Sequence, residues 1–271
     1  GAIDLQAKMS KKSYLDTVQI IKSNILEGEI YEMNFCQEYY AEKVELQPLN
    51  LYNRLNSIAK APYSAYYQVN DFHLLCGSPE RFLAKRGAEI ISQPIKGTIR
   101  KGATATEDQE LIAQLSTSEK DRAENVMIVD LVRNDLARVS KSGSVYFTEL
   151  FGVYSYLQVH QMISTIQSKL KENVIFSDIL QALFPMGSMT GAPKIATMKH
   201  IDKIESFKRG WYSGAVGYID PDDNFDLNVV IRSVLCDTSK QIINYNAGGA
   251  ITIDSDAETE WKEVHLKTKA I

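Results

Sequence analysis

The chain has 271 residues, of which 44% are hydrophobic, and a formal net charge of -4, so it can bury a core without disulfides. The acidic balance argues against a nucleic-acid partner, because such a surface needs clustered Lys and Arg to displace counterions from phosphate groups. If the substrate is an anion, its binding site must therefore be built from a few well-placed cations, a metal or backbone N–H groups. No apolar run approaches the roughly 18 residues of a membrane-spanning helix, and the N-terminus lacks the layout of a signal peptide, so we expect no membrane partner.

Three cysteines, Cys36, Cys76 and Cys236, are far apart, and each lies in an apolar or strand-like stretch. Their odd number and their surroundings favour buried free thiols over bridges or metal ligands. Because reduced thiols persist in reducing compartments, we expect a cytoplasmic location.

The first part of the chain is predicted to hold one helix followed mainly by strands. The helix runs from about Ser13 to Glu27, and Gly28 supplies its C-terminal stop. The elements that follow are strands at Ile30–Tyr40, Ser64–Leu75, Phe82–Lys85 and Glu89–Ser92, hairpin turns at Asn70-Asp71 and Arg86-Gly87, and a short helix at Leu51–Ala59.

From Thr106 to about Val139 the pattern is helical, in two pieces that meet near Ser118, the expected N-cap of the second piece. The later elements are strands at Ser144–Phe151 and Tyr154–Gln167, helices at Phe176–Phe184 and Ala192–Ile204, strands at Tyr212–Ile219, Leu227–Cys236, Gln241–Tyr245 and Ala250–Ile253 with a turn at Asp220–Asp223, and a last helix from about Asp256 to Lys269. Because strands arrive in groups without regular βαβ alternation, we expect an α+β class with largely antiparallel sheets. One domain over residues 1–271 is the simplest account.

Two pairs of carboxylates lie three residues apart in predicted helices. Asp121 and Glu124 share one helix face, and Glu260 and Glu263 share a face of the last helix. Carboxylates that converge from two helices suit a hard cation such as Mg²⁺, which takes oxygen ligands and keeps waters that a substrate can replace. Spacing alone favours the other interpretation, in which both pairs are solvated surface groups.

Lys96 stands beside Gly97 in the stretch Pro94–Thr98, which ends a β-rich run. Desolvation would lower its pKa from the usual value of about 10.4 and leave a neutral amine that can act as nucleophile or base. Taken alone, such a lysine is more often a surface cation. Glu80 precedes Arg81, and a pair with Arg81 or another cation is the simplest explanation of this carboxylate.

Two glycine-bearing segments permit close backbone approach. The loop Gly187–Lys194 opens a helix with Pro193 suited to its first turn, and its N–H groups could hold an anion. Its spacing is not that of a phosphate-binding loop, so we expect no nucleotide site. Gly248-Gly249 indicates either close approach of another backbone or a tight bend between strands.

Arg232 lies in the apolar predicted strand Leu227–Cys236, where an unpaired charge is costly. It therefore needs a carboxylate partner, which is either structural or part of a ligand. His160 could orient a substrate, although a lone strand histidine is more often a hydrogen-bonded core residue.

Together these stretches resemble the chorismate-utilising enzymes, a family that includes anthranilate synthase component I, aminodeoxychorismate synthase component I, and the isochorismate and salicylate synthases. The resemblance covers nearly the whole chain in the family's order. The matching motifs are Ser78–Phe82, Pro94–Thr98, Asp121–Asn125, Val129–Leu136, Gly187–Lys194, Tyr212–Tyr218, Ile231–Ser233 and Ala247–Ile251, followed by Glu260, Glu263 and Lys267. The resemblance implies an α+β fold of two packed, mainly antiparallel sheets with helices on the outside.

Lys96 is the informative position within the family. Lysine there is typical of the aminodeoxychorismate branch, whereas anthranilate synthases typically have alanine, and Asn34 and the stretch Asp121–Asp135 also look more like that branch. This implies Mg²⁺-dependent amination of chorismate at C4 to 4-amino-4-deoxychorismate, a step toward p-aminobenzoate and folate, with ammonia from a glutamine amidotransferase subunit. The alternatives are anthranilate synthase component I and a non-catalytic chorismate-binding module or fragment.

The resemblance also implies roles for individual residues. Lys96 would attack C2 of the ring while Glu80 protonates the departing C4 hydroxyl, and ammonia would then add at C4 and expel the lysine. The residues implied to bind chorismate are Gly97, Thr98, His160, Thr190, Tyr212, Arg232, Gly248, Gly249, Ala250 and Lys267, with Tyr212 and Arg232 on the enolpyruvyl carboxylate.

For the metal, the resemblance implies that Glu124 and Glu263 bind Mg²⁺, with Asp121 and Glu260 nearby as support. Full-length relatives usually carry a considerable N-terminal region before the first helix. We therefore expect a naturally short protein or a fragment that lacks part of the family's sandwich and its tryptophan-binding pocket. Ala250 stands where many relatives have glycine and is expected to narrow the approach to the ligand, and Ala257 stands where many have proline. We expect both changes to be tolerated.

Overall fold

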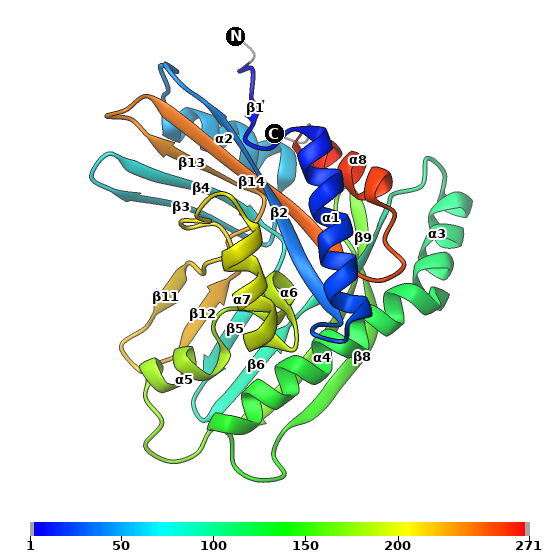
Figure 1. Ribbon diagram of the computed structural model, residues 1–271. Coiled ribbons are helices and arrows are strands. Elements are labelled where there is room, and N and C mark those ends of the chain that lie inside the picture. Colours follow the sequence, from blue (N-terminus) through cyan, green and yellow to red (C-terminus); the bar gives the residue numbers. More distant parts are fainter. Residues whose placement is uncertain (1–2, 269–271) are drawn as a thin grey trace. The chain divides into compact units, whose positions relative to one another are not determined.

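The computed structural model describes residues 3–268, which divide into two compact units. Unit 1 takes in the chain up to Pro79, Met189–Gly214 and everything from Val230 onward, and unit 2 takes in Glu80–Ser188 and Ala215–Val229. Each unit contains one seven-stranded antiparallel sheet with its own helices (Figure 1). No helix within the described residues combines the length and the apolar character that a membrane span needs.

Unit 1 is built on a sheet with the strand order β1-β2-β14-β13-β4-β3, to which β10 is added at β2. Every neighbouring pair is antiparallel. Its elements are β1 (Gln6–Ala7), α1 (Lys11–Leu26), β2 (Glu32–Ala41), α2 (Pro48–Ala59), β3 (Tyr63–Val69), β4 (Phe72–Ser78), β10 (Gly191–Ala192), α7 (Lys194–Ile204), β13 (Ser233–Asp237), β14 (Ile242–Ile251) and α8 (Ala257–Thr268).

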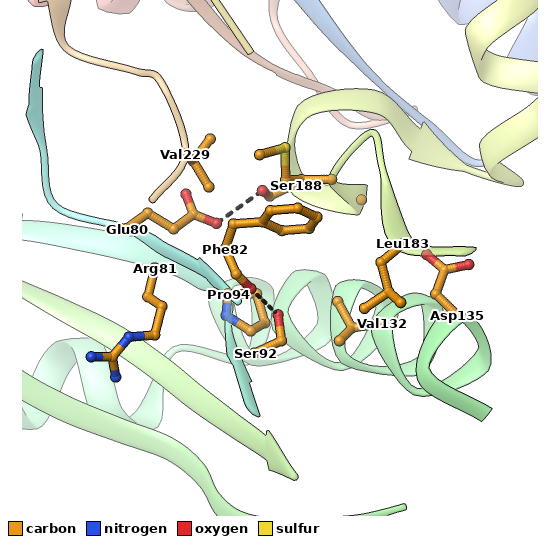
Figure 2. Close-up of a pocket in the computed structure, with 12 residues that line it drawn as sticks. Glu80, Arg81, Phe82, Ser92, Pro94, Val132, Asp135, Leu183, Ser188 and Val229 are labelled. Atoms are coloured by element: carbon orange, nitrogen blue, oxygen red, sulfur yellow. Dashed lines mark hydrogen bonds between the residues drawn. The ribbon is translucent and has the colours of Figure 1, made fainter. Parts of the chain in front are cut away.

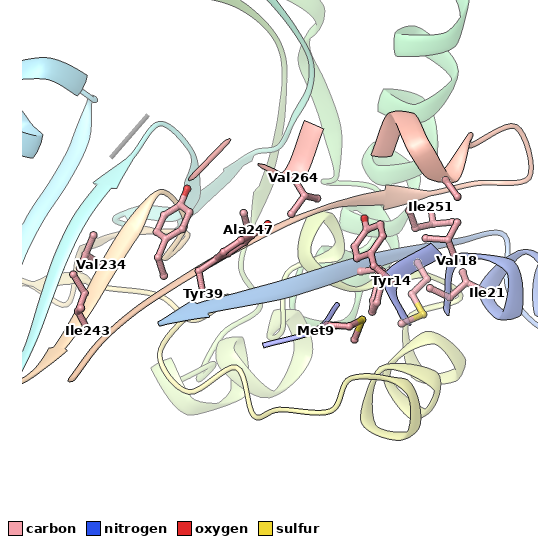
Figure 3. Close-up of a cluster of buried hydrophobic side chains, with 14 of the residues drawn as sticks. Met9, Tyr14, Val18, Ile21, Tyr39, Val234, Ile243, Ala247, Ile251 and Val264 are labelled. Carbon is pink, nitrogen blue, oxygen red and sulfur yellow. The ribbon is translucent and has the colours of Figure 1, made fainter. Parts of the chain in front are cut away.

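The core of unit 1 forms where α1 and α8 lie against the β2–β14 pair (Figures 1 and 3). Tyr14, Val18 and Ile21 form the fully buried stripe of α1, as its helical spacing predicts. The ring of Tyr14 packs on Phe35 of β2 with centroids 4.9 Å apart. The same ring packs edge-on against Trp261 of α8, with centroids 5.1 Å apart, and α8 lies against β14 with Val264 fully buried.

Unit 2 has the strand order β11-β12-β5-β6-β9-β7, with β8 paired to β9. Its elements are β5 (Arg81–Arg86), β6 (Glu89–Gln93), β7 (Ile95–Arg100), α3 (Ala105–Thr117), α4 (Glu119–Val139), β8 (Tyr146–Ser155), β9 (Val159–Lys169), α5 (Phe176–Leu183), β11 (Gly217–Ile219) and β12 (Phe225–Asn228). The one-turn helix α6 (Gly187–Thr190) contributes residues to both units. Consecutive strands β6 and β7 pair with different stretches of β9, and Pro94, which has no N–H to donate, separates them.

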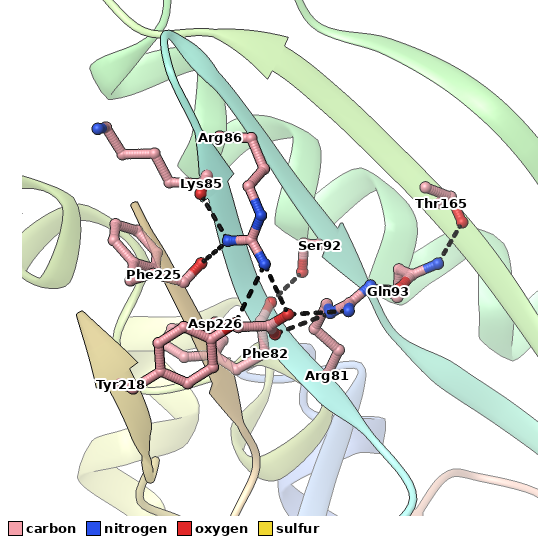
Figure 4. Close-up of polar contacts among 10 residues, drawn as sticks. All are labelled: Arg81, Phe82, Lys85, Arg86, Ser92, Gln93, Thr165, Tyr218, Phe225 and Asp226. Carbon is pink, nitrogen blue, oxygen red and sulfur yellow. Dashed lines mark hydrogen bonds and ion pairs between the residues drawn. The ribbon is translucent and has the colours of Figure 1, made fainter. Parts of the chain in front are cut away.

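A polar network ties β12, β5, β6 and β9 together in unit 2 (Figure 4). The guanidinium of Arg81 donates two hydrogen bonds to Asp226, each 2.9 Å long, and a third to Gln93 at 2.6 Å. Gln93 donates in turn to Thr165 at 3.0 Å. Arg81 therefore forms a bidentate pair with Asp226. The cation whose charge acts on Glu80 is Lys96, in line with the second possibility that the sequence left open.

Several expectations from the sequence are confirmed. Ser118 is the N-cap of α4, its side chain accepting from the N–H of Asp121. Ser10 caps α1 in the same way, which was not predicted, so this helix begins before the expected Ser13. Gly28, with a φ of 79°, follows the end of α1. All three cysteines are free and buried.

Other predicted boundaries of strands were wrong. Of the expected strand Tyr212–Ile219 only the last three residues form β11, and the expected strand Leu227–Cys236 is broken because Arg232 has a φ of 51°. Two strands were predicted at Gln241–Tyr245 and Ala250–Ile253. The structure has one continuous strand there, β14, which runs from Ile242 to Ile251. The end of the last predicted helix at Lys269 lies outside the described residues.

The predicted boundary between β8 and β9 was also wrong. β8 extends to Ser155 and β9 begins at Val159, whereas Tyr154 was expected to start the second strand. Pro193 is the N-cap residue of α7 and not part of its first turn. The short elements β1, β10 and α6 carry too little pattern to be predicted.

Candidate active site

Glu80 of unit 2 is a buried carboxyl group at the start of β5. Its side chain accepts a hydrogen bond of 2.9 Å from the hydroxyl of Ser188, and its backbone carbonyl accepts from Val229 N–H at 3.0 Å. Burial raises the pKa of Glu80 to about 7, although the Ser188 hydrogen bond, the charge of Lys96 and the N–H of Ile95 each lower it. This carboxyl group can therefore carry a proton near neutral pH.

A small cavity of about 20 Å³ lies beside Glu80 within unit 2 (Figure 2). It has room for roughly one water molecule and none for a substrate ring. In Figure 2 the Glu80 carboxyl points toward Ser188, and Ser92 donates to the carbonyl of Phe82 at 2.8 Å. The side chains around Glu80 thus isolate it from bulk solvent, which is the physical cause of its raised pKa.

Lys96 and Gly97 lie on β7, where the register against β9 shifts between Ile95 and Thr98. Gly97 has a φ of 91°, and a Cβ atom on it would lie 3.0 Å from the Cδ1 atom of Leu115 and 3.1 Å from the Cβ of Asp121. A side chain at this position would be strained and crowded. Lys96 is half-buried at this irregular part of β7. It belongs to the same unit as Glu80, and its charge is close enough to lower the pKa of that carboxyl group.

The first expected carboxylate pair, Asp121 and Glu124, lies on the first two turns of α4 and is half-buried. Asp121 contacts the Gly97 backbone region, and a carboxylate oxygen of Glu124 is 3.9 Å from Lys120 Nζ. The next residue, Asn125, is buried and accepts a hydrogen bond of 2.6 Å from Ser164. The packing of α4 on β7 and β9 therefore places this pair beside the Lys96 strand.

His160 is completely buried on β9 with both ring nitrogens engaged. Nε2 is 2.9 Å from Asp108 and Nδ1 is 2.8 Å from the hydroxyl of Ser155. Of the two interpretations offered by the sequence, this environment favours the hydrogen-bonded core residue. Contact between His160 and a substrate stays a prediction.

In unit 1, Gly248 and Gly249 lie in the middle of β14 and allow close approach of β2, not a tight bend. A Cβ atom on Gly248 would lie only 2.6 Å from the carbonyl oxygen of Phe35, and one on Gly249 would lie 3.3 Å from the carboxylate of Glu260. Half-buried Ala250 continues the strand opposite Asn34.

Helix α8 brings three of the expected residues to these glycines. Lys267 Nζ donates to the carbonyl of Gly248 at 2.8 Å and lies 2.7 Å from a carboxylate oxygen of Glu263. Glu260 is 9% exposed and accepts from Ser255 at 2.8 Å. The expected second carboxylate pair and Lys267 are therefore brought together with Gly248-Gly249 in unit 1.

The donor chemistry of the four carboxylates fits a hard cation such as Mg²⁺, since all supply oxygen ligands. Asp121 and Glu124 belong to unit 2 and Glu260 and Glu263 to unit 1, so neither unit contains more than two of the four. Within residues 3–268 no group of three or more His, Cys, Asp or Glu side chains is positioned to hold a metal.

The remaining expected substrate ligands of unit 1 lie outside its long helices and strands. Tyr212 is buried in a turn with its hydroxyl 3.7 Å from Cys36 Sγ, and burial raises its pKa well above the usual range. Thr190, in α6, is 3% exposed. Half-buried Arg232 forms no ion pair with a carboxylate of the described residues, and its charge acts on the nearby hydroxyl of Tyr245.

Sequence reasoning missed Arg209 as a functional candidate. Its guanidinium makes a bidentate pair with Glu205 at 2.8 and 2.6 Å and donates to three further groups of unit 1. The one signal available was the four-residue spacing between Glu205 and Arg209. Both residues follow the end of α7, and the same spacing is common among exposed ion pairs.

Comparison with known proteins places these features in a family. A family model described as chorismate binding enzyme matches residues 1–271. Aminodeoxychorismate synthase of Arabidopsis thaliana is 43% identical over 96% of this chain, and component 1 of the Escherichia coli enzyme is 37% identical over 99%. The chain spans 28% of the length of the first relative and 58% of the second.

Solved structures agree with this placement. Anthranilate synthase component I from Streptococcus pneumoniae superposes with a TM-score of 0.90 at 30% identity, covering 99% of this chain and 59% of that one. The Escherichia coli isochorismate synthase MenF has a TM-score of 0.88 at 19% identity, covering 99% of this chain and 62% of that one, and this likeness concerns the fold alone. The expected α+β fold with antiparallel sheets is confirmed, and the chain belongs to the family of chorismate binding enzymes.

Proposed function

We propose that this chain is the chorismate-aminating part of an aminodeoxychorismate synthase, converting chorismate to 4-amino-4-deoxychorismate with ammonia from a glutamine amidotransferase partner. The observation that carries the proposal is the pairing, in one unit, of an amine at Lys96 with Glu80, a buried carboxyl group whose pKa is raised to about 7. Relatives named aminodeoxychorismate synthase are 35 to 44% identical to this chain, which supports the assignment.

In this reaction Lys96 is the nucleophile and Glu80 the general acid. The step requires Lys96 in its amine form: its nitrogen bonds to C2 of the ring, the ring double bond shifts, and the C4–O bond breaks as Glu80 gives its proton to the departing hydroxyl, which leaves as water. The surplus proton on the lysine nitrogen returns to the Glu80 carboxylate. Ammonia then bonds to C4 and the C2–N bond breaks, and the proton lost by the new amine goes to Lys96.

The proposal assigns the substrate contacts residue by residue. Arg232 and Tyr212 bind the enolpyruvyl carboxylate, and Gly248–Ala250 let the ring approach the backbone of β14. Thr98, exposed on β7, and Thr190, at the end of α6, supply hydroxyl groups. Gly97, His160 and Lys267 complete the proposed set of substrate residues, and the engagement of both His160 nitrogens favours an indirect contribution.

We assign Glu124 and Glu263 as the residues that hold Mg²⁺, with Asp121 and Glu260 supporting them. When bound, the cation supplies the counter-charge for the ring carboxylate. Lys120 Nζ is 3.9 Å from a carboxylate oxygen of Glu124 and Lys267 Nζ is 2.7 Å from one of Glu263, and metal binding would compete with these lysine contacts. Replacing Glu263 with alanine is expected to abolish turnover, while full activity in EDTA would contradict the assignment.

The direct test is to incubate the protein with chorismate, Mg²⁺ and ammonium and to identify the product by liquid chromatography and mass spectrometry. We expect 4-amino-4-deoxychorismate, and anthranilate as the product would contradict the proposal. In the absence of ammonium, intact-mass analysis should show an adduct that peptide mapping localises to Lys96. The Lys96→Ala variant is the control, because it retains the site but lacks the amine and should remain unmodified.

A further inference from the structure

Arg209 makes five hydrogen bonds inside unit 1 although none of the proposed roles involves it. Nε and Nη2 donate to the two carboxylate oxygens of Glu205 at 2.8 and 2.6 Å. Nη1 donates to the carbonyl of Met189 at 2.6 Å and to Ser213 Oγ at 3.2 Å, and Nη2 also donates to the carbonyl of Asn34 at 3.0 Å. We call these five residues the Arg209 cluster. The side chains of Arg209 and Glu205 are 14% and 2% exposed, so solvent screens this pair little.

The backbone segments in the Arg209 cluster adjoin the proposed chorismate ligands. Each of three cluster residues lies next to a proposed ligand: Met189 precedes Thr190, Ser213 follows Tyr212, and Asn34 pairs with Ala250 across β2 and β14. These segments are far apart in sequence and share no helix. One planar group with five fixed donors can set the spacing of all three, which the single ammonium of a lysine cannot do.

Tyr212 is held from several sides by the same cluster. Its N–H donates to the carbonyl of Arg209 at 3.0 Å, and its hydroxyl is 3.7 Å from Cys36 Sγ, whose backbone N–H donates to Glu205 at 3.2 Å. The neighbouring Ser213 has a φ of 67°, a left-handed conformation that costs energy for a residue with a side chain and persists only where contacts impose it. The N–H of Ser213 donates to Val230 at 2.9 Å, and its hydroxyl accepts from Arg209.

We propose that Arg209 is a positioning residue for chorismate: it holds the Thr190, Tyr212 and Ala250 segments at their binding spacing before the substrate arrives. A site ordered in advance does not lose binding free energy in ordering these segments when the ligand enters. The inference rests on the proposed role of these segments in chorismate binding. Removing the cluster should weaken affinity far more than it slows the chemical step, because Arg209 lies outside the unit that contains Glu80 and Lys96.

The test compares Arg209→Lys with the wild-type chain. Lysine keeps a positive charge for Glu205 but loses the planar set of donors. Calorimetric titration with chorismate in Mg²⁺ buffer without ammonium should show a Kd raised about tenfold or more. With ammonium, KM should rise in parallel while kcat changes by less than about threefold. Lys208→Met is the matched control, since Lys208 is the adjacent residue and its ion pair with Asp202 is exposed, so its Kd should not change.

Hydrogen–deuterium exchange separates positioning from general stability. In Arg209→Lys the amides of residues 187–193 and 210–214 should exchange faster, whereas those of the β3–β4 hairpin should not change. A double variant, Arg209→Met with Glu205→Leu, removes both charges without leaving one unpaired and covers the case in which Arg209→Lys does not fold. It should show the same loss of affinity.

An unchanged Kd in Arg209→Lys, or in the double variant if only that one folds, would overturn the proposal. So would a loss of affinity accompanied by faster exchange throughout unit 1, because that result describes a purely structural role. A wild-type chain that binds chorismate but forms no aminated product would refute the proposed function, and the affinity comparison would still decide the role of Arg209.

Discussion

The two units each bury a glutamate, and the partners of the two carboxyl groups differ. Glu205 in unit 1 receives two hydrogen bonds from the permanently charged Arg209 and one from a backbone N–H. Glu80 in unit 2 receives hydrogen bonds from the neutral hydroxyl of Ser188 and the N–H of Ile95, and burial raises its pKa to about 7 in spite of the nearby charge of Lys96. A buried carboxylate fixed by a guanidinium anchors the structure, whereas one held by a hydroxyl can exchange a proton near neutral pH.

The largest effect that would test this contrast is loss of catalysis on removal of the acid. Glu80→Gln keeps the shape of the side chain and its contact with Ser188 but has no proton to give. Amination should fall by roughly 100- to 10,000-fold, the usual contribution of a general acid. Steady-state rates with chorismate and ammonium measure this, and a loss below tenfold would mean that the departing hydroxyl is protonated by another group.

The matching change in unit 1 should act on stability instead. Glu205→Gln leaves the guanidinium of Arg209 buried without its counter-charge, which typically costs about 3 to 5 kcal/mol. Urea unfolding at pH 7 should show this destabilisation, whereas Glu80→Gln should show none. Equal effects from the two substitutions would remove the distinction between the two glutamates.

The pH dependence of stability provides a finer test of Glu80. Its pKa is raised from 4.5 to about 7, so the folded protein binds this proton more tightly than the unfolded chain does. The stability that follows is fully present below the unfolded pKa and is lost as the pH rises through about 7. Glu80→Gln cannot ionise, so at pH 8 it should be more stable than wild type by up to roughly 3 kcal/mol. Urea unfolding at pH 5 and pH 8 checks this, and a difference that does not grow with pH would contradict the raised pKa.

The smallest expected effect concerns Ser213. Ser213→Gly removes one hydroxyl contact of the Arg209 cluster but relaxes a left-handed backbone conformation that glycine adopts freely. The two changes oppose each other, so the unfolding free energy should change by less than about 1 kcal/mol. Chorismate affinity should fall by at most about threefold, well short of the Arg209→Lys effect. Calorimetric titration of both variants side by side would show whether the hydroxyl or the backbone carbonyls dominate.

The sequence predicted the elements with strong local signals. The stripe of α1, the cap at Ser118 and the hairpin at Asn70-Asp71 depend on neighbouring residues, and all three are present. The break at Arg232 and the continuity of β14 through Gly248 depend on tertiary contacts. The pattern of apolar residues carries no record of those contacts, so both were predicted wrongly.

The candidate site divides in the same way. Glu80 and Lys96 lie in contiguous motifs, so sequence comparison finds them without a structure. Arg209 went unnoticed because two of its acceptors are backbone carbonyls, of Met189 and Asn34, which have no residue identity to recognise. For His160 the sequence left two interpretations open, and only the distances to its ring nitrogens favour one.

The bulge at Gly97 has an evolutionary consequence. The contacts described for it are the pairing of Ile95 with Ile163 and the fit of the Gly97 backbone against Leu115 and Asp121, and none of them depends on the side chain at position 96. A codon change there would leave these backbone contacts in place, while it would remove the lysine charge that acts on Glu80. A lineage with this scaffold can therefore vary the chemical group at position 96, whereas a side chain at position 97 would be strained and crowded.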